Sequence, residues 1–193
     1  LHLCDRRQRQ MCIRDRGNNM GVKNSLGDII LIMNPDVRMV EPLFKKAVNY
    51  FDSNKEVALL GMKQWYNKGK EGLSFDVDPS YSFLHPFLCA IKSRIYNKLS
   101  KFDNRDMYIN GSCFFICKQP FVKIGMFDEK IFMYCEEKDL NRRLRNSGYE
   151  ITFDKNMNYF HLAGERSFSY DEFRMTLDSE LYYYCLLYTS DAA

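Results

Sequence analysis

Short runs of consecutive hydrophobic residues alternate along the chain with longer amphipathic stretches. Residues 28–33 and 57–60 are nearly continuous apolar runs, which are typical of strands buried on both faces of a sheet. The first run ends at Asn34-Pro35, because proline restricts the residue before it and cannot donate to a neighbouring strand. Residues 41–52 predict a helix, since their apolar residues share one face: Leu43, Phe44, Ala47, Val48 and Phe51.

The rest of the chain continues this alternation. Residues 66–82 are rich in Lys, Gly, Asp, Pro and Ser and predict a long loop. Alternating strands and helices favour an α/β fold with a largely parallel sheet. The other expected elements are a helix over 83–99 with a break near Pro86, a strand region over 108–118 interrupted at Asn110-Gly111, a helix over 136–146 ended by Gly148, strands over 151–153 and 159–161, and a helix over 170–184.

Both ends of the chain depart from this pattern. Residues 1–16 have no hydrophobic periodicity, and the codons of residues 1–16 and 185–193 can be read as opposite strands of a transposase-type sequencing adapter. We therefore expect both segments to be artefacts that pack poorly. Residues 17–184 would then be the genuine protein, a single partial domain.

Composition changes this picture in two ways. The chain has 28 Lys+Arg against 25 Asp+Glu, but five arginines and three aspartates lie in the end segments, which leaves a net charge of +1. This balance gives no support to a nucleic-acid partner. Of the seven cysteines, Cys113 and Cys117 would lie on one face of a strand as small buried residues. We expect reduced thiols, no structural zinc and a cytoplasmic protein. No apolar stretch approaches the roughly 20 residues that span a membrane, which predicts a soluble segment.

The first candidate for chemistry is Asn34-Pro35-Asp36, directly after a buried strand. Open α/β sheets bind ligands at the carboxyl ends of their strands, and oxygen-bearing side chains there can hold Mg²⁺ or Mn²⁺. The alternative is an ordinary Asn-Pro-Asp turn.

The second candidate is the acidic start of the 136–146 helix, with Glu136, Glu137 and Asp139. Acids in a first turn complement the helix dipole, and Asp139 can pair with Arg143 four residues later. Glu137, however, lies on the same face as the apolar residues of the helix. A carboxylate at the edge of a buried face suits a general base, because partial desolvation raises its pKa.

Two further positions are weaker candidates. His161 ends a short predicted strand; it can be a structural residue, a metal ligand or a phosphate contact. Asn110-Gly111 interrupts another predicted strand, which indicates either a bulge or a close approach of the backbone to a ligand.

Taken in order, these segments resemble glycosyltransferase family 2, which has the GT-A fold, and in particular its bacterial members related to rhamnosyltransferases. In that family the second acid of the helix is usually Asp, where this chain has Glu137. The family's first strand, first helix and second strand have no counterpart here. The resembling segments are residues 17–28, 34–36, 108–113, 125–129, 132–134, 136–144 and 148–149, with His161 and Ser167.

The resemblance implies a GT-A-type, Rossmann-like sheet that lacks its first βαβ portion. It implies inverting transfer of a sugar from a dTDP- or UDP-sugar donor to a glycan or lipid-linked acceptor, in cell-surface polysaccharide or glycolipid synthesis. Asp36 and His161 would hold Mg²⁺ or Mn²⁺, and Glu137, or Glu136, would be the base. The donor or substrate contacts would be Asn34, Asn110, Gly111, Asp139 and Arg143.

The implied location is the cytoplasm, with peripheral association at the inner face of the bacterial membrane as an open alternative. The resemblance also leaves two possibilities for this chain. The truncated segment can be inactive by itself, or it can be a non-catalytic module that binds a nucleotide-sugar or a glycan.

Overall fold

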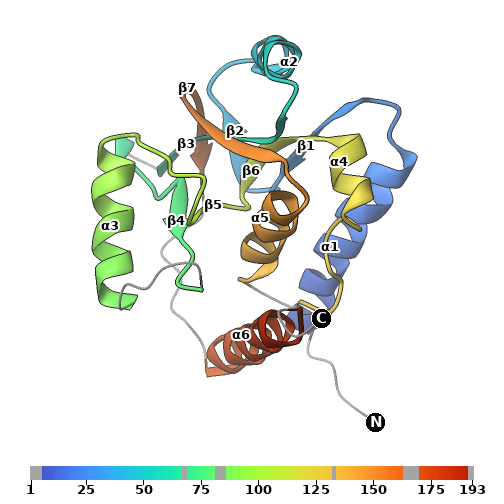
Figure 1. Cartoon of the computed structure of the whole chain (residues 1–193), viewed down its shortest axis with the longest axis vertical. Helices are drawn as coiled ribbons and strands as arrows, with labels where there is room; N and C mark the ends of the chain where they lie inside the picture. Colours follow the sequence, from blue (N-terminus) through green and yellow to red (C-terminus); the bar gives the residue numbers. More distant parts are fainter. Residues whose placement is uncertain (1–5, 67–68, 81–85, 132–133, 163–169, 191–193) are drawn as a thin grey trace.

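The computed structural model describes residues 6–66, 69–80, 86–131, 134–162 and 170–190 (Figure 1). The predicted positions Phe132 and Ser167 lie outside the described residues. The elements in chain order are α1 (Arg6–Asn24), β1 (Ile29–Met33), β2 (Val37–Met39), α2 (Phe44–Ser53), β3 (Val57–Tyr66), β4 (Phe75–Val77), α3 (Pro86–Lys98), β5 (Met107–Ile109), β6 (Cys113–Cys117), α4 (Lys118–Lys123), α5 (Glu136–Asn146), β7 (Glu150–His161) and α6 (Tyr170–Ser190).

A five-stranded sheet in the order β1-β6-β3-β7-β2 forms the centre, and β4 and β5 form a separate antiparallel pair. Only β3 and β7 run parallel; β1–β6, β3–β6 and β2–β7 are antiparallel. The α/β class is confirmed, but the prediction of a largely parallel sheet is wrong, because the sheet is mixed. Continuous apolar runs indicate burial on both faces, and this burial does not determine strand direction.

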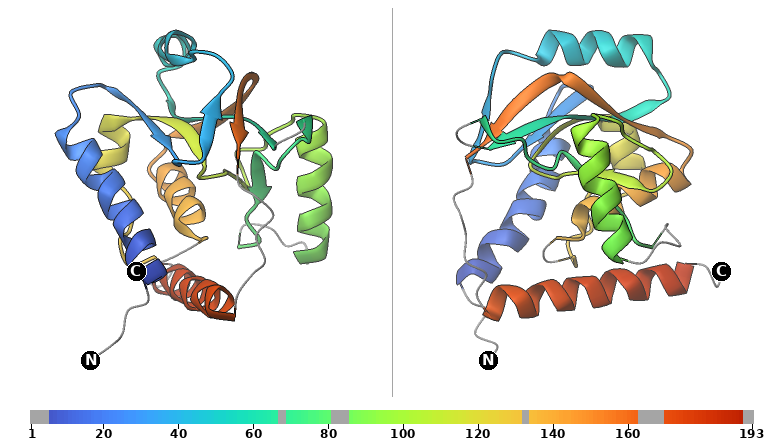
Figure 2. Two further views of the ribbon diagram at one scale, coloured as in Figure 1. Left: turned by 180° about the vertical axis from the view of Figure 1, so that it is seen from behind. Right: turned by 90° about the vertical axis from the view of Figure 1, so that its left-hand side faces the viewer.

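The sheet is buried on both faces because helices cover each side. In Figures 1 and 2, α2 lies alone on one side and the other helices lie on the opposite side. Successive side chains of a strand point to opposite faces. Accordingly, Phe114 and Ile116 of β6 pack in the cluster that contains Leu140 and Leu144 of α5. Cys113 and Phe115 pack with the cluster of α2, whose buried residues include Leu43, Ala47 and Phe51.

Several expected elements are confirmed and others are corrected. The helix over 136–146 has the expected bounds, and Gly148 follows it with a φ of 79°, which suits a residue without a Cβ. The predicted loop 66–82 contains strand β4. Apolar and acidic residues alternate over residues 75–78, which favours a strand, but the polar composition around them favoured the prediction of a loop. The two strands expected over 151–161 are one strand, β7, with an irregular register between Asp154 and Asn158.

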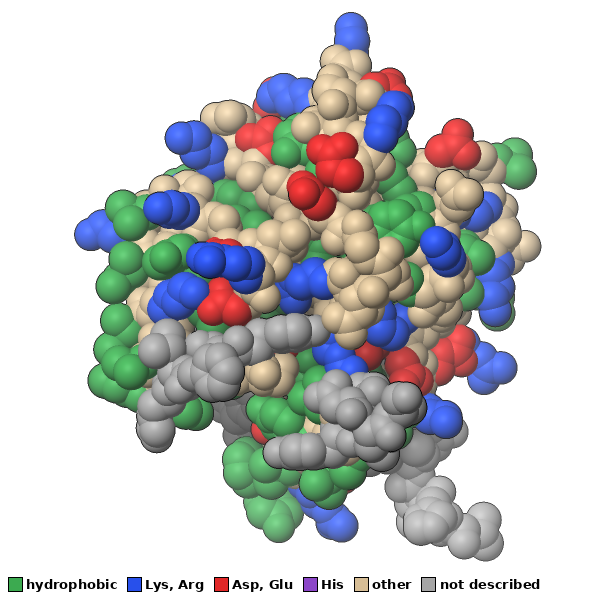
Figure 3. Space-filling view, viewed as in Figure 1, with side chains coloured by type: hydrophobic (Ala, Val, Ile, Leu, Met, Phe, Trp, Pro, Cys, Tyr) green, Lys and Arg blue, Asp and Glu red, His purple; other side chains and the backbone are tan. Residues whose placement is uncertain are grey.

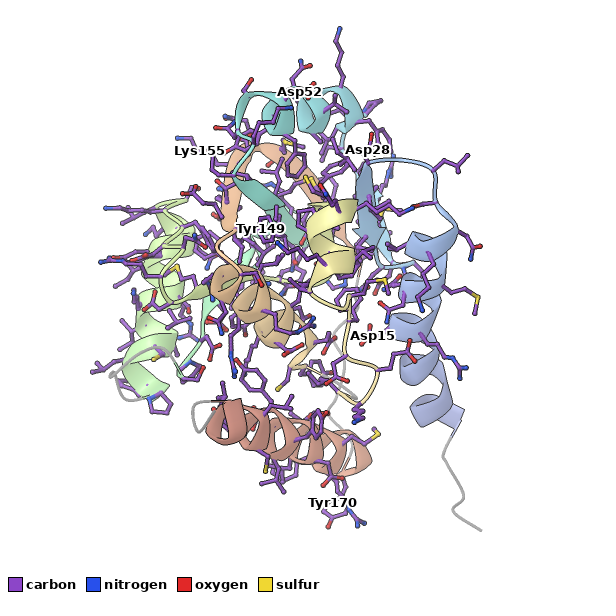
Figure 4. The ribbon with its side chains drawn as sticks, turned by 45° about the vertical axis from the view of Figure 1, so that its right-hand side comes forward. Asp15, Asp28, Asp52, Tyr149, Lys155 and Tyr170 are labelled. Carbon is purple, nitrogen blue, oxygen red and sulfur yellow. The ribbon has the colours of Figure 1, made fainter. Side chains whose placement is uncertain are left out.

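The described parts of the two end segments, residues 6–16 and 185–190, belong to helices α1 and α6. Asp15 of α1 is buried and lies between α1 and the rest of the chain (Figure 4). Asn19, which follows the predicted artefact segment in the same helix, donates to the carbonyl of Phe127 and accepts from its amide. At the other end, Leu187 packs against the buried Tyr183 of α6. Asp15 and Leu187 therefore make packing contacts within the two predicted artefact segments, and the described parts of these segments form no strand. A search for hydrophobic periodicity could not find these contacts, since one is polar and the other involves the end of a helix.

Helix α3 is attached to the small sheet by polar side chains. The buried Asn97 amide nitrogen donates to the carbonyls of Phe75 and Ser93, and its oxygen accepts from the Ser74 amide, all at 2.8 Å. The Ser93 hydroxyl accepts from the Val77 amide at 2.9 Å. Asn97 and Ser93 therefore form hydrogen bonds with backbone groups in β4 and just before it. The short β4–β5 pair does not provide partners for these groups.

Replacing Asn97 with alanine is expected to lower the free energy of unfolding by about 2 to 4 kcal/mol, because it leaves buried backbone groups at Ser74 and Phe75 without their partner. Urea unfolding followed by circular dichroism measures this change. Asn156→Ala, at an exposed position of β7, is the matched control and should change stability by about 0.5 kcal/mol or less. Equal losses in the two variants would contradict this role of Asn97.

Candidate functional site

Asp36 and His161 meet where β2 begins and β7 ends. The register pairs Val37 with His161, and the Leu162 amide donates to the Asp36 carbonyl at 2.7 Å. This pairing brings the Asp36 carboxylate Oδ1 to 3.4 Å from His161 Nε2, with both side chains partly exposed. The ring of Tyr66 stacks on that of His161 with 6.4 Å between centroids. Two residues far apart in the sequence thus form one pair that opens to solvent.

The Asn34–Asp36 segment also forms the turn that was the alternative interpretation. The Val37 amide donates to the Asn34 carbonyl at 3.1 Å, and the Asn34 amide donates to the Ser112 carbonyl at 2.9 Å. The turn and a ligand role are compatible, because the turn uses the backbone of Asn34 while the carboxylate of Asp36 points to His161.

Glu137 lies against the backbone of Gly111. A Cβ added to Gly111 would be 2.5 Å from Glu137 Cγ and 2.7 Å from its Cδ, so the Glu137 side chain would have to shift. Asn110 precedes this contact: its side-chain oxygen accepts from the Ser112 amide at 3.1 Å, and its own amide donates to the Ser74 carbonyl. The Asn110-Gly111 interruption is therefore a turn whose glycine allows close approach of the Glu137 side chain.

Ser112 connects these two parts of the candidate site. Its carbonyl accepts from Asn34, two residues before Asp36, while the residue before it, Gly111, contacts Glu137. The Ser112 hydroxyl is itself held in the interior, 2.9 Å from Gln64 Oε1 and 2.7 Å from the Tyr159 hydroxyl. The Tyr159 hydroxyl also donates to Gln64 at 2.8 Å. This buried network fixes the backbone that joins the Asp36 side of the site to the Glu137 side.

The other predicted acids of α5 are placed differently. Glu136 is buried. Asp139 and Arg143 are two and six residues beyond Glu137, so at 100° per residue they lie on the opposite side of the helix. Arg143 pairs with Asp139 at 2.6 Å and donates to the Ile124 carbonyl at 2.7 Å. The structure does not bring Asp139 and Arg143 to Glu137.

Arg143 instead lines a cavity of about 400 Å³ between α1 and the 124–129 segment, to which Asn19 and Lys23 also contribute. None of Asp36, His161 and Glu137 lines this cavity. Because Arg143 pairs with Asp139 and donates to the Ile124 carbonyl, this pair holds the 124–129 segment against α5.

Tyr108 lies within electrostatic reach of Glu137, Asp76 and Asp78, and neither Tyr108 nor these two aspartates were predicted from the sequence. Burial, together with the negative charges of Asp76 and Glu137, raises the pKa of Tyr108 well above its usual value, so its hydroxyl stays protonated and can donate. Lys138 Nζ lies 5.9 Å from the Tyr108 ring centroid. The alternation of Phe75-Asp76-Val77-Asp78 could have identified two acids on one face of a strand.

Among the thiols, burial raises the pKa of Cys113 and of Cys135 to about 12, which disfavours the thiolate form that reacts. Cys113 and Cys117 both contact the cluster of α2, which confirms that they share one face of β6. All the cysteines whose side chains are described are free thiols.

The Asp36–His161 pair fits two neighbouring positions around a divalent ion. Adjacent ligands of an octahedral ion with bonds of about 2.1 Å lie roughly 3 Å apart, close to the observed 3.4 Å. Within the described part of the chain, no cluster of three or more His, Cys, Asp or Glu side chains could hold a metal ion. An ion at this pair would therefore take its other ligands from water and substrate phosphate, the usual arrangement for Mg²⁺.

Replacing Gly111 with alanine is expected to displace Glu137, because the new methyl group would overlap its side chain. Overpacking of this kind costs about 1 to 3 kcal/mol, which thermal unfolding measures. Combining Gly111→Ala with Glu137→Ala removes the overlapping atoms and should restore most of the loss. If the double variant instead loses as much stability as the two single variants lose together, the two side chains do not contact each other.

Comparisons with known proteins concern the fold and distant homology. No family model matches the chain. Rhamnosyltransferase WbbL of Escherichia coli (strain K12) is 29% identical over 162 residues, which is 81% of this chain and 61% of that protein. N-acetylglucosaminyl-diphospho-decaprenol L-rhamnosyltransferase of Mycobacterium tuberculosis is 40% identical over 42 residues, 22% of this chain and 14% of its own length.

A solved structure, GalNAc-T7 with UDP, GalNAc and Mn²⁺, superposes with a TM-score of 0.53 at 13% identity, over 77% of this chain and 30% of that one. The chain is distantly homologous to bacterial rhamnosyltransferases and is similar in fold to GT-A glycosyltransferases. The predicted resemblance is confirmed to that extent. The chain spans about three-fifths of the length of the E. coli relative.

Proposed function

We propose that the protein transfers a sugar from a nucleoside-diphosphate donor, a dTDP- or UDP-sugar, to an acceptor hydroxyl with inversion at the anomeric carbon. One observation carries the proposal: a backbone hydrogen bond from Asn34 to Ser112 links the segment of Asp36, which pairs with His161, to the turn that contacts Glu137. Distant homology to rhamnosyltransferases supports the reaction class.

Asp36 and His161 would hold Mg²⁺ or Mn²⁺. When bound, such an ion stabilises the negative charge that develops on the diphosphate leaving group. Asp36 would face the donor diphosphate in this arrangement, and Asn34, one residue before the proline, lies on the same turn. The donor phosphates would supply further oxygen ligands and, together with Asp36, would balance the positive charge of the ion.

Glu137 would accept the proton of the acceptor hydroxyl as that oxygen attacks the anomeric carbon. Gly111 leaves room for the carboxylate beside the Asn110 turn, and the backbone at Asn110-Gly111 would line the sugar pocket. The protonated Tyr108 hydroxyl is a donor near this carboxylate. Asp139 and Arg143 would act at a distance from the reacting atoms, by holding the 124–129 segment against α5.

The chain covers 61% of the length of the E. coli relative. Activity is therefore best tested on the full reading frame that contains this chain. The acceptor would be a glycan or lipid-linked saccharide of the cell surface, used at the cytoplasmic face of the membrane.

The alternative function is a non-catalytic module that binds a nucleotide-sugar or a glycan. Release of nucleoside diphosphate from dTDP- and UDP-sugars, with and without Mn²⁺ and a lipid-linked acceptor, distinguishes the two functions. Metal-dependent release that increases with acceptor supports transfer. Saturable donor binding without any release would establish the binding module and contradict transfer.

A further inference from the structure

The polarity of helix α3 is inverted relative to its burial. The side chains that face the protein are small or polar, namely Cys89, Ser93 and Asn97, and all three are buried. Large apolar side chains cover the opposite, solvent-facing side, with exposed fractions of 38 to 68%: Phe87, Leu88, Ile91, Ile95 and Leu99. A surface helix of a globular protein normally places its apolar stripe against the core, so the outer stripe of α3 requires another explanation.

Basic residues accompany this outer stripe. Helix α3 contains no Asp or Glu, whereas Arg94, Lys98 and Lys101 are all exposed. The nearby acids are already paired, Asp103 with Arg105 at 2.8 Å and Asp106 with Lys92 at 2.6 Å. In the part of the chain that the structure describes, none of the three exposed cations makes an ion pair.

Figure 3 shows hydrophobic side chains gathered along the outer edge of the molecule where α3 lies, with Lys and Arg side chains beside them. No helix among the described residues is long and apolar enough to cross a bilayer. An apolar stripe flanked by cations is instead the pattern of a helix that lies in the plane of a membrane surface, with its apolar side chains among the acyl chains and its cations at anionic headgroups.

We propose that the outer face of α3, together with the chain that follows it, docks the protein on an anionic lipid bilayer. This surface is formed by Phe87, Leu88, Ile91, Ile95, Arg94 and Lys98 of the helix and by Leu99 and Lys101 just after it. A second copy of the chain is a less suitable occupant, because two of these faces would bring like charges together. The inference is independent of sugar transfer, since docking needs neither donor nor acceptor.

Helix α6 provides an internal comparison. It also exposes apolar side chains, among them Leu177 and Leu181, and Tyr170 projects from its outer side (Figure 4). Asp178 and Glu180 lie among them, so an anionic surface would repel this helix. Exposed apolar area alone thus does not distinguish α3. What distinguishes it is the combination with cations that form no ion pair with any described residue.

Sedimentation with vesicles tests the proposal on the 193-residue chain. We expect binding to vesicles of phosphatidylcholine with about one-third phosphatidylglycerol, little binding to phosphatidylcholine alone, and loss of binding as salt rises from about 0.1 M to about 1 M. Lys98→Gln combined with Lys101→Gln should weaken the partition coefficient roughly 30-fold. Ile95→Ser should weaken it roughly tenfold through the lost apolar contact.

Matched controls separate docking on α3 from general attraction. Lys45→Gln combined with Lys155→Gln removes two exposed cations from α2 and β7, where Lys155 is labelled in Figure 4. Leu181→Ser removes an exposed leucine of α6. Both controls should bind as the unchanged protein does. Equal effects of test and control variants, equal binding to neutral and anionic vesicles, or no binding would overturn the proposal. So would a dimer in solution that Ile95→Ser dissociates while vesicle binding is absent.

Discussion

Replacing Glu137 with glutamine is expected to lower the turnover of sugar transfer by about 100-fold or more while leaving donor binding nearly unchanged. Glutamine has almost the same shape as glutamate, so it can keep the contact with Gly111, but it cannot accept the proton of the attacking hydroxyl. Initial rates and donor titrations on the full reading frame measure the two effects separately. A purely structural role of Glu137 would not lower turnover while leaving donor binding unchanged.

Glu136 provides the control for this assignment. It is adjacent in the sequence and buried, and it points about 100° away from Glu137 around the helix. Glu136→Gln should retain most of the turnover if it folds. If Glu137→Gln kept full activity and Glu136→Gln lost its activity, the base would be Glu136 and not Glu137.

Replacing Asp36 with alanine is expected to abolish the metal-dependent part of transfer, a loss of at least about 100-fold. The hydrogen bond from Leu162 uses the Asp36 backbone carbonyl, so the register of β2 and β7 should survive the change. Titration with Mn²⁺ in the presence of nucleoside diphosphate should show weaker metal binding in this variant.

Asp52→Ala, at an exposed carboxylate near the end of α2 (Figure 4), is the matched control and should leave both activity and Mn²⁺ binding unchanged. His161→Gln should weaken Mn²⁺ binding as Asp36→Ala does. Undiminished Mn²⁺ binding in both Asp36→Ala and His161→Gln would reject this pair as the metal site.

The sequence predicted best where one periodicity dominates. Helix α5 has the expected bounds because Leu140 and Leu144 repeat at helical spacing and Gly148 ends the helix. The segments of β1 and β3 were also predicted correctly, because each is a short continuous apolar run. Strand direction could not be predicted, because it depends on which segments meet, as when β6 follows β5 through the short turn at Asn110–Ser112 and pairs with both β1 and β3 in the antiparallel sense.

The candidate site shows the same division. Motif order indicated Asp36, Gly111, Glu137 and His161, but only the pairing of β2 with β7 places His161 beside Asp36. Spacing could not show that Asp139 and Arg143 bind the 124–129 segment, since that contact involves the distant Ile124 carbonyl. The inversion of α3 was equally hidden, because a helical pattern does not show which face meets the protein until Ser93 and Asn97 are seen bonded to β4 and its neighbours.

The most direct test of the central claim is an anomalous difference map at the manganese edge, from crystals of the protein with Mn²⁺ and a nucleoside diphosphate. The account predicts one Mn²⁺ peak at bonding distance, about 2.1 Å, from Asp36 Oδ1 and His161 Nε2, with diphosphate oxygens as further ligands and Glu137 facing the same opening. A peak that neither Asp36 nor His161 contacts, or a diphosphate bound away from this pair, would contradict it.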